Sequence, residues 1–572
     1  MPKSSRLLRE LRHEPVGGHS IFANPDAQSS PRPTHPRASQ HGSNMSTVKR
    51  RAVRPVPATL LDQCTICMEE QLFSQAFALL GSGLNAGLDT NTPACIPPPQ
   101  HLALAVTIAV HPSLTTRTDD QDKQAASNHA LTYLREVLAV VGSENSGLRE
   151  ALQFGGPSTV RLDRSKRAKT RRSDRAYASD EEEHAGKLRS QYTEKQSIAE
   201  NAQDFWSVVG WAFNCSIKHK ARWARWRVWL DLVLDVLEED LEGRSAVTGA
   251  DLSKTLIAQY MSTVGAGRNN KRRIMRAVLA DGTTKSMAEF GEIWKNESKP
   301  PKKQEQKRTA KRRKLDLDND NYGDYFDNDS EEDTAANRSR RSRSATASRG
   351  RRSRTPVNRE TGSDNNDNDS GFEDAFEGDS IEEFGGIASI QLRQRLLALF
   401  ATFSRAAPQL FDRVNELFAL YTEFMRPLPL NVFQQFVLPT RPYLNPHYQA
   451  TLNEMLSRPL LGSSGIDDPI GQKEFESTFA ASAATSTSAV DNAKVSLLSE
   501  SLLRALWRGG HLTHDMSTLK SLVEEGIRLR HEKCAGDGRK KTGKSAYADE
   551  EARLAMECSG QRMKVLLSVI AS

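Results

Sequence analysis

The residues best suited to chemistry in this 572-residue chain are two cysteines near its beginning, Cys64 and Cys67. They have the Cys-x-x-Cys spacing at which a pair of thiolates binds one Zn²⁺ ion. A structural zinc site needs four such ligands, and the next cysteine and histidine, Cys95 and His101, do not form a second pair of this kind. The sequence therefore supplies half of a metal site, and we predict that no metal is bound.

The segment that begins at Cys64, with the sequence CTICMEE, resembles the opening of a RING zinc finger of a ubiquitin ligase. A RING domain needs eight Cys or His ligands because it closes two tetrahedral zinc sites, and this chain lacks the remainder of that set. The resemblance implies an unconventional zinc-dependent ubiquitin ligase. The alternative, which we prefer, places Cys64 on the buried face of a helix, because free cysteines are common in protein cores.

Motifs typical of enzymes do not occur in the sequence. It contains no phosphate-binding GxxxxGKS/T loop, no GxSxG nucleophile elbow and no HExxH metal-binding pair. His511 and His514 stand beside Asp515, but a single cluster of this kind after two glycines is more typical of the first turn of a helix than of a metal site. We therefore expect a non-enzymatic protein without a cofactor or a small-molecule substrate.

Two short basic clusters, at residues 164–175 and 302–314, carry the most specific functional signal in the sequence. The second resembles a two-part nuclear localisation signal, whose extended cationic chain would suit the groove of an importin. It predicts a nuclear protein with importin as one partner. The residues expected to direct nuclear import are Lys302, Lys303, Lys307, Arg308, Lys311, Arg312, Arg313 and Lys314.

Arginine and serine alternate in residues 338–355, a pattern that resembles the RS segments of splicing and chromatin proteins. Such a tract can bind DNA or RNA through phosphates without sequence preference, although the acidic blocks beside it would compete for the same arginines. A second stretch, RWARWRVW at residues 222–229, could bind phosphates and stack against bases because it alternates arginine with tryptophan. The candidate nucleic-acid contacts are Arg222, Arg225, Arg227, Arg338, Arg340, Arg341, Arg343, Arg351 and Arg352.

Three positions have the sequence context of phosphorylation sites. Ser179 and Ser330 precede runs of acidic residues, which acidophilic kinases prefer, and Thr355 precedes Pro356. A phosphate adds roughly −1.5 to −2 charge at neutral pH and would shift the balance between neighbouring acidic and basic blocks. We expect the segments that carry these residues to be regulatory linkers.

The composition limits the class of protein. The hydrophobic content of 37% is concentrated between long polar tracts, and the formal net charge of +7 hides local blocks of both signs. Six scattered cysteines are too few for a disulfide framework and indicate a reducing compartment. No apolar run approaches the ~18 residues of a membrane span, so we expect no membrane association. Met45 precedes a second basic run and is an alternative start to Met1.

The apolar parts of the chain show helical spacing and little strand signal. The strongest pattern lies in residues 204–242, which hold five of the seven tryptophans. From Trp223 onward the apolar residues follow steps of three and four, so we expect a central helix that buries a wide stripe. Because Trp223, Trp226 and Leu230 share that stripe, we favour a core role over an exposed nucleic-acid surface.

Local capping signals make two further predictions. One helix is expected to begin at Thr59, as its N-cap, and to continue to about Leu80 with Leu72 on its buried face. Residues 118–121, with the sequence TDDQ, are expected to form a capping box for a helix that stops at Gly142.

These patterns predict an all-α protein in which helical segments alternate with polar ones. The predicted order is a disordered basic N-terminal tail (1–56), a helical segment (57–155), a disordered basic and acidic insertion (156–196), a helical segment with the Trp-rich helix (197–297), a disordered linker with basic, acidic and RS-like tracts (298–386), a helical segment (387–462), a Ser/Ala-rich linker (463–494) and a helical C-terminal segment (495–572). Charged insertions of this length cannot build a core. The helical body is expected to be an irregular repeat of HEAT or armadillo type, and a helical bundle is the alternative because no fixed-period repeat occurs.

The preferred function is that of a nuclear, non-enzymatic scaffold that binds other nuclear proteins in a chromatin-associated complex. DNA or RNA binding through the basic tracts is the second hypothesis. The zinc-dependent ubiquitin ligase is the third.

Overall fold

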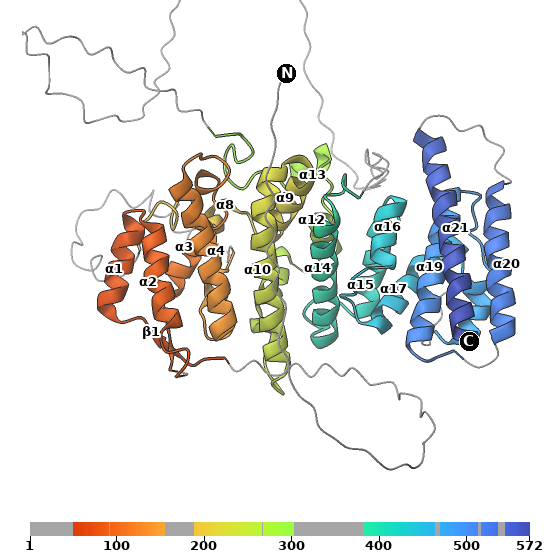
Figure 1. Cartoon of the computed structure of the whole chain (residues 1–572), viewed down its shortest axis with the longest axis horizontal. Coiled ribbons are helices and arrows are strands. Elements are labelled where there is room, and N and C mark those ends of the chain that lie inside the picture. The colour runs from red at the N-terminus through yellow and green to blue at the C-terminus, as the bar shows by residue number, and fades with distance from the viewer. Residues whose placement is uncertain are drawn as a thin grey trace, which may run out of the picture. The chain divides into compact units, whose positions relative to one another are not determined.

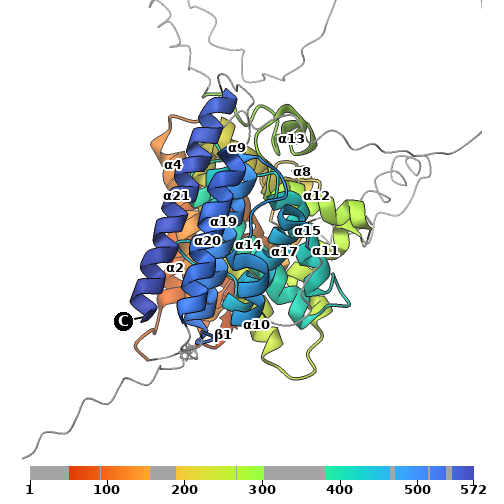
Figure 2. The ribbon, with the colours of Figure 1, turned by 90° about the vertical axis from the view of Figure 1, so that its right-hand side faces the viewer.

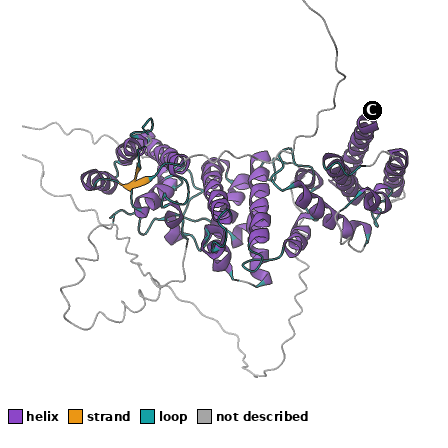
Figure 3. Ribbon diagram, turned by 90° about the horizontal axis from the view of Figure 1, so that it is seen from below, coloured by secondary structure: helices purple, strands orange, loops and turns teal. Residues whose placement is uncertain are grey.

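Helices account for nearly all of the regular structure, as the sequence pattern predicted. The computed structural model describes residues 50–90, 92–154, 188–265, 267–301, 381–463, 470–512, 516–535 and 544–571. Within these residues there are nineteen α-helices and one pair of three-residue strands (Figure 1, Figure 3). None of the described helices combines the length and the apolar character that crossing a membrane requires. The all-α class is confirmed.

The described residues of the first half of the chain form eleven α-helices. They are α1 (Ala58–Glu69), α2 (Phe73–Asn85), α3 (Pro99–Ile108), α4 (Gln121–Val141), α5 (Leu148–Ala151), α8 (Ile198–Asn201), α9 (Phe205–Lys218), α10 (Lys220–Ser245), α11 (Leu256–Val264), α12 (Arg268–Val278) and α13 (Thr284–Glu289). The helices of the second half are α14 (Ile387–Ala406), α15 (Val414–Met425), α16 (Leu430–Val437), α17 (Pro446–Leu461), α18 (Gln472–Phe475), α19 (Ala489–Arg508), α20 (Met516–Ala535) and α21 (Lys544–Ala571).

The two strands, β1 (Val53–Pro55) and β2 (Ala94–Ile96), pair in parallel with Arg54 opposite Cys95. They join the chain before α1 to the chain after α2. Arg51 strengthens this junction, because its buried guanidinium donates to the backbone oxygens of Leu84 and Ala86 at 2.8 and 2.7 Å. Strands of three residues are too short to produce an alternating pattern, so the sequence did not predict them.

The prediction of a single helix from Thr59 to Leu80 was wrong. Gln71, whose φ of 61° lies in the left-handed region, stands between α1 and α2 and interrupts the helical path. Pro57, rather than Thr59, is the N-cap of α1. Leu72 is 47% exposed because it lies in the turn instead of on a continuous buried face.

The helix α4 ends where predicted, but its cap differs. Asp120 is the N-cap, and its Oδ1 accepts from the backbone N–H of Asp122 at 3.0 Å. Thr118 instead accepts from the backbone N–H of Asp120. Gly142 follows the last turn with a φ of 89°, a conformation that favours glycine. The stop at Gly142 is therefore confirmed, and the predicted capping box is not.

The Trp-rich stretch forms two consecutive helices, α9 and α10, which pack against each other (Figure 1). The first begins with a capping box in which Oδ1 of Asp204 accepts from the backbone N–H of Ser207 at 2.7 Å. α10 also contacts α4, α11 and α14, so the prediction of a central helix that buries a wide stripe is confirmed. The tryptophans that these two helices bury are Trp206, Trp211, Trp223, Trp226 and Trp229.

The boundaries predicted for the polar segments enclose residues that belong to the fold. β1 lies inside the predicted N-terminal tail, and the described parts of the insertion and of both linkers contribute buried aromatic residues, namely Tyr192, Phe384, Phe475 and Phe479. The last two belong to α18 and to a π-helical turn, Glu476–Ala480. Isolated aromatic residues in polar sequence give little periodic signal, and contacts with distant helices bury them.

Buried side chains connect the helical segments. One cluster extends from Val56 to Met556 and takes members from all four predicted helical segments. A second cluster includes Phe475, Leu506 and Met563 from α18, α19 and α21. Figure 2 shows α19, α20 and α21 together, and α21 contacts both of the other helices. All described residues belong to one compact unit, Arg50–Ser572.

Candidate functional site

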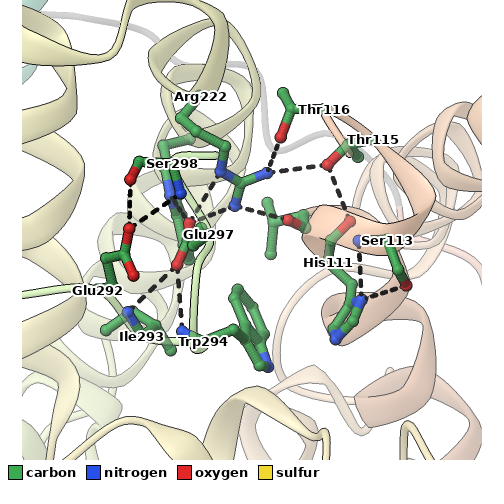
Figure 4. A network of polar contacts seen from close by, with 12 residues as sticks. His111, Ser113, Thr115, Thr116, Arg222, Glu292, Ile293, Trp294, Glu297 and Ser298 are labelled. Carbon is green, nitrogen blue, oxygen red and sulfur yellow. Dashed lines mark hydrogen bonds and ion pairs between the residues drawn. The ribbon is translucent and has the colours of Figure 1, made fainter. Parts of the chain in front are cut away.

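Arg222, in the first turn of α10, lies at the centre of a buried polar network (Figure 4). Its Nε and Nη2 donate to Oε1 of Glu297 at 2.9 and 2.5 Å. Its Nη2 also donates to the backbone oxygen of Val110, and its Nη1 donates to Oγ1 of Thr115, both at 2.8 Å. The side chains of Arg222 and Glu297 are 2% and 0% exposed, so this ion pair is shielded from water.

Glu297 receives additional donors from its other neighbours in the network. Its Oε1 accepts from the indole Nε1 of Trp226 at 2.9 Å, and its Oε2 accepts from the backbone N–H groups of Ile293 and Trp294, both at 3.2 Å. A buried ion pair is stable only when further hydrogen bonds satisfy both groups in this way. The network therefore holds α10 against two segments that are distant in sequence, and its role is structural.

The burial of Arg222 contradicts its prediction as a nucleic-acid contact, because its three nitrogens all donate to protein oxygens. Arg225 is half-buried and donates to Oδ1 of Asn128 at 2.5 Å; burial, together with nearby Arg222, lowers its pKa. Arg227 is exposed. Trp223, Trp226 and Trp229 face the core, so the alternation of arginine and tryptophan does not create an exposed aromatic surface.

Arg227 lines a groove of about 640 Å³ between α10 and α14. Arg395 of α14 forms ion pairs there with Asp231, Asp235 and Glu238 of α10, at 3.0, 2.5 and 2.6 Å. A phosphate group in this groove would meet carboxylates as well as arginines. The surface around Arg227 is therefore poorly matched to a nucleic-acid backbone, which is recognised by concentrated positive charge.

A second fully buried arginine, Arg393 of α14, also has a structural role. Its Nη1 and Nη2 donate to the backbone oxygens of Val278 and Ala280 at 3.0 and 2.9 Å, near the end of α12. Its guanidinium carbon lies 4.3 and 4.2 Å from the ring centroids of Phe213 and Phe384. Burial lowers the pKa of Arg393 to about 9, opposed by the nearby Asp281 carboxylate.

Cys64 and Cys67 both lie on the buried side of α1. Burial, and secondarily Cys67, raises the pKa of Cys64 to about 11, so this thiol is protonated at neutral pH, whereas zinc binds thiolates. Among the residues that the structure describes, no group of three His, Cys, Asp or Glu side chains could hold a metal ion. The pair therefore has the core environment that the preferred interpretation predicted.

A second groove, of about 620 Å³, lies between α17 and α19 and is called the α17–α19 groove below. Its volume is in the range of sites that bind small ligands or peptide side chains. Apolar side chains from both helices contribute to its wall, together with several cationic groups. The lining residues are Asn415, Pro446, His447, Ala450, Thr451, Glu454, Met455, Arg458, Ile470, Leu502, Ala505, Leu506, Arg508, Gly509 and His511.

The charged groups of the α17–α19 groove differ in their ion pairing within the described residues. The Nε of Arg458 donates to Oε1 of the buried Glu454 at 2.7 Å, so this pair is internally neutral. Arg508 is exposed, and no described carboxylate forms an ion pair with it. His447 and His511 are also exposed along the lining. An apolar wall beside an exposed arginine fits a segment of another protein that carries both apolar and acidic side chains.

The sequence did not predict the α17–α19 groove, because a groove forms only when two helices that are separated in the chain come together. α17 and α19 are separated by a stretch that was interpreted as a linker. The one available signal was the pair Arg504 and Arg508 at the end of an apolar helix. The structure separates their roles, since Arg504 pairs with Glu500 at 2.6 Å whereas Arg508 lines the groove.

The remaining predicted site residues lie outside the described part of the chain. They are Ser179, Lys302, Lys303, Lys307, Arg308, Lys311, Arg312, Arg313, Lys314, Ser330, Arg338, Arg340, Arg341, Arg343, Arg351, Arg352, Thr355 and His514. Nuclear import, phosphorylation and nucleic-acid binding through the RS-like tract therefore stay predictions of the sequence.

Comparison with known proteins does not assign the chain to a family. No family model, curated protein or solved structure matches it.

Proposed function

We propose that this chain is a nuclear, non-enzymatic helical scaffold that binds other proteins in a chromatin-associated complex. The observation that carries the proposal is the α17–α19 groove, where Met455 and Leu506 lie beside the exposed Arg508. The partner segment that fits this groove is amphipathic, with an apolar face for the wall and acidic residues near Arg508. The buried charged clusters of Arg222 and Arg393 are used in packing, which leaves recognition to surfaces of this kind.

The contacts between helices favour an irregular α-solenoid of HEAT or armadillo type as the framework of this scaffold. α1 contacts α2, α9 contacts α10, α14 contacts α15, α15 contacts α17, and α17 contacts α19. Helices that mainly contact others one or two places away along the chain are typical of such repeats. The irregular lengths of the helices, from four to twenty-eight residues, favour the alternative of a helical bundle.

The nuclear part of the proposal rests on the basic cluster at 302–314. Its two groups of lysine and arginine suit recognition by importin. Phosphorylation at Ser179, Ser330 or Thr355 would add negative charge to the flanking segments and regulate their contacts. Deletion of 302–314 is expected to leave the full-length protein in the cytoplasm, and unchanged nuclear fluorescence of the tagged deletion variant would contradict nuclear import through this cluster.

Affinity purification from nuclei tests the scaffold function and the groove together. The tagged full-length protein is compared with a double variant, Met455→Glu and Arg508→Glu, which places two carboxylates in the groove. The matched control is Ile66→Glu, because Ile66 is 55% exposed on α1 and does not line the groove. We expect a stoichiometric set of partners with the wild type and the control, and loss of at least one of them with the groove variant.

The same purification after nuclease treatment distinguishes this function from nucleic-acid binding. Partners that bind the protein directly remain after nuclease treatment. If all partners are lost after nuclease treatment, the protein binds nucleic acid, and the arginines of the RS-like tract at 338–355 become the main site. If the partners survive nuclease but are unaffected by the groove variant, the scaffold function stands and the groove assignment fails. Equal unfolding temperatures of the groove variant and the wild type are the check that the variant folds.

A further inference from the structure

The last helix, α21, has an apolar stripe on its solvent side. Tyr547, Leu554 and Val565 are 69%, 61% and 61% exposed, and Val569 is 55% exposed. Cys558 lies between them and is also exposed. The steps between these five residues are seven, four, seven and four, which keep them within roughly 60° of one helix face at 3.6 residues per turn. Together they form the α21 stripe, which is about 33 Å long at 1.5 Å per residue.

The opposite face of α21 is the one that attaches it to the fold. Ala552, Met556, Met563 and Leu567 are buried there, and the helix contacts α19 and α20 on that side (Figure 2). The α21 stripe is therefore a second apolar face, separate from the buried face that attaches α21 to the fold. Single exposed apolar residues are normal, but a continuous row of them on a helix marks an interaction surface.

We propose that the α21 stripe pairs with the α21 stripe of a second copy of this chain, in antiparallel orientation. The two ends of the stripe are symmetric about Cys558, since Tyr547 and Val569 lie eleven residues before and after it, and the inner residues Leu554 and Val565 lie four and seven residues from it on opposite sides. Antiparallel pairing about Cys558 therefore places Tyr547 of one copy near Val569 of the other. A two-fold interface needs a surface that is complementary to itself, and this residue order meets that requirement.

The charges beside the stripe favour the same orientation. Glu550, Glu557 and Lys564 are exposed on one flank of the stripe. A two-fold axis perpendicular to the helix brings this flank of one copy against the same flank of the other in reverse order. Lys564 then lies within two residues, roughly 3 Å along the axis, of Glu550 in the second copy. Glu557 lies equally close to Glu557 of that copy, so the antiparallel flank has two contacts of opposite charge and one of like charge. Parallel pairing would instead align the acidic first halves of the two helices, and their helix dipoles would also repel.

The oligomeric state of the full-length protein tests this proposal. Light scattering after size exclusion is expected to show a dimer for the wild type and a monomer for a double variant, Leu554→Glu and Val565→Glu. The control is Val247→Glu, because Val247 is 62% exposed but lies away from α21, and this variant should remain dimeric. A monomeric wild type at all concentrations, or a dimer that the stripe variant leaves intact, would overturn the proposal.

Charge exchange tests the orientation. Lys564→Glu and Glu550→Lys are each expected to raise the dimer dissociation constant roughly fivefold, which is the scale of an exposed ion pair. The two substitutions together restore the opposite charges across the interface and should return the constant to the wild-type value. Additive weakening in the double variant would contradict antiparallel pairing.

Thiol crosslinking locates the interface directly. The other five cysteines are buried, so a short bismaleimide should join two chains through Cys558, and Cys558→Ser should abolish the product. In the Cys558→Ser background, antiparallel pairing predicts efficient crosslinking when Tyr547→Cys and Val569→Cys are combined, and little with Tyr547→Cys alone. Efficient crosslinking by Tyr547→Cys alone would indicate parallel pairing and refute the proposed orientation.

Discussion

Arg222 and Glu297 form an ion pair across 75 residues of sequence, with an Nη2–Oε1 distance of 2.5 Å and almost no exposure to solvent. The pair lies where α10 meets residues 110–115 and the chain after α13. Each partner needs the other, because an unpaired charge in this position would have neither water nor a counter-ion.

The first prediction concerns this pair. Arg222→Met leaves the Glu297 carboxylate buried without its counter-ion and should lower the free energy of unfolding by about 3–5 kcal/mol. The same substitution at Arg135, whose side chain is 45% exposed and 3.4 Å from Asp231, should change it by less than about 1 kcal/mol. Denaturant unfolding measures both values.

A double variant separates loss of the attraction from burial of an unpaired charge. Arg222→Met combined with Glu297→Met removes both charges, so it should be less destabilising than the sum of the two single substitutions. Additive effects of the two single substitutions would show that the ion pair is not coupled as the structure requires.

The second prediction concerns the close approach of α9 to Phe290. A Cβ atom at Gly210 would overlap the Phe290 ring, and both residues are inside the fold. Gly210→Ala is therefore expected to lower the free energy of unfolding by about 2 kcal/mol, in the range for overpacking. Gly243→Ala is the matched control in α10, because nothing lies within 4 Å of its added Cβ, and it should raise stability by up to about 1 kcal/mol. Equal effects of the two substitutions, measured by thermal unfolding, would contradict this packing.

Periodicity predicted those parts of the fold in which the buried face is continuous. The buried face of α14 follows the helical spacing of its apolar residues Leu392, Leu396, Leu399, Phe400 and Phe403. Trp223 and Trp226 of α10 are core residues as predicted. In such helices the burial of one residue depends on its spacing from neighbours in sequence, so the sequence contains the information.

The rest of the fold depends on distant partners. Arg222 is buried because it pairs with Glu297, which is distant in sequence. Nothing near Arg222 in the sequence distinguishes it from the exposed Arg227. The break between α1 and α2 depends on one residue, Gln71, in an uncommon backbone conformation. The α17–α19 groove and the α21 stripe likewise become visible only when the packing of each helix shows which of its faces remains uncovered.

The third prediction concerns acid sensitivity. Burial, followed by the nearby Arg222 and Arg117 guanidinium groups, lowers the pKa of His111 to about 3. Below pH ~6.5 the unfolded chain binds a proton at this residue that the folded chain does not bind, so stability falls as the pH falls, by about 1.4 kcal/mol per pH unit down to pH ~3. The effect should be about 1.4 kcal/mol at pH ~5.5.

His111→Asn isolates this contribution. Nδ1 of His111 accepts from the backbone N–H of Ser113 at 3.3 Å as the cap of a short 3-10 turn, and an asparagine oxygen can replace it. The variant should lose less stability than the wild type when the pH is lowered from ~7.5 to ~5.5, because asparagine does not titrate. Identical losses in the two proteins would show that His111 is not held neutral in the fold.

The fourth prediction concerns Lys494, which is buried in α19. Its Nζ donates to the backbone oxygen of Arg426 at 2.6 Å and lies 5.1 Å from the ring centroid of Phe433. Burial, aided by Arg426 and opposed by Asp491, lowers the pKa of Lys494 to about 8. Between pH ~8 and ~10.5 the unfolded chain binds more protons at this residue than the folded chain, so stability rises with pH in that window.

Lys494→Met should therefore be at least as stable as the wild type at neutral pH, because an apolar side chain of similar length removes the buried charge. The difference between the two proteins should move in favour of the wild type by about 2 kcal/mol from pH ~8 to ~10, since the wild-type lysine becomes neutral in the folded state over this range. Denaturant unfolding of both proteins at the two pH values removes the contributions of tyrosines and other lysines, which they share. A variant that is strongly destabilised at neutral pH, with no change in the difference at higher pH, would show that the hydrogen bond to Arg426 outweighs the burial of the charge.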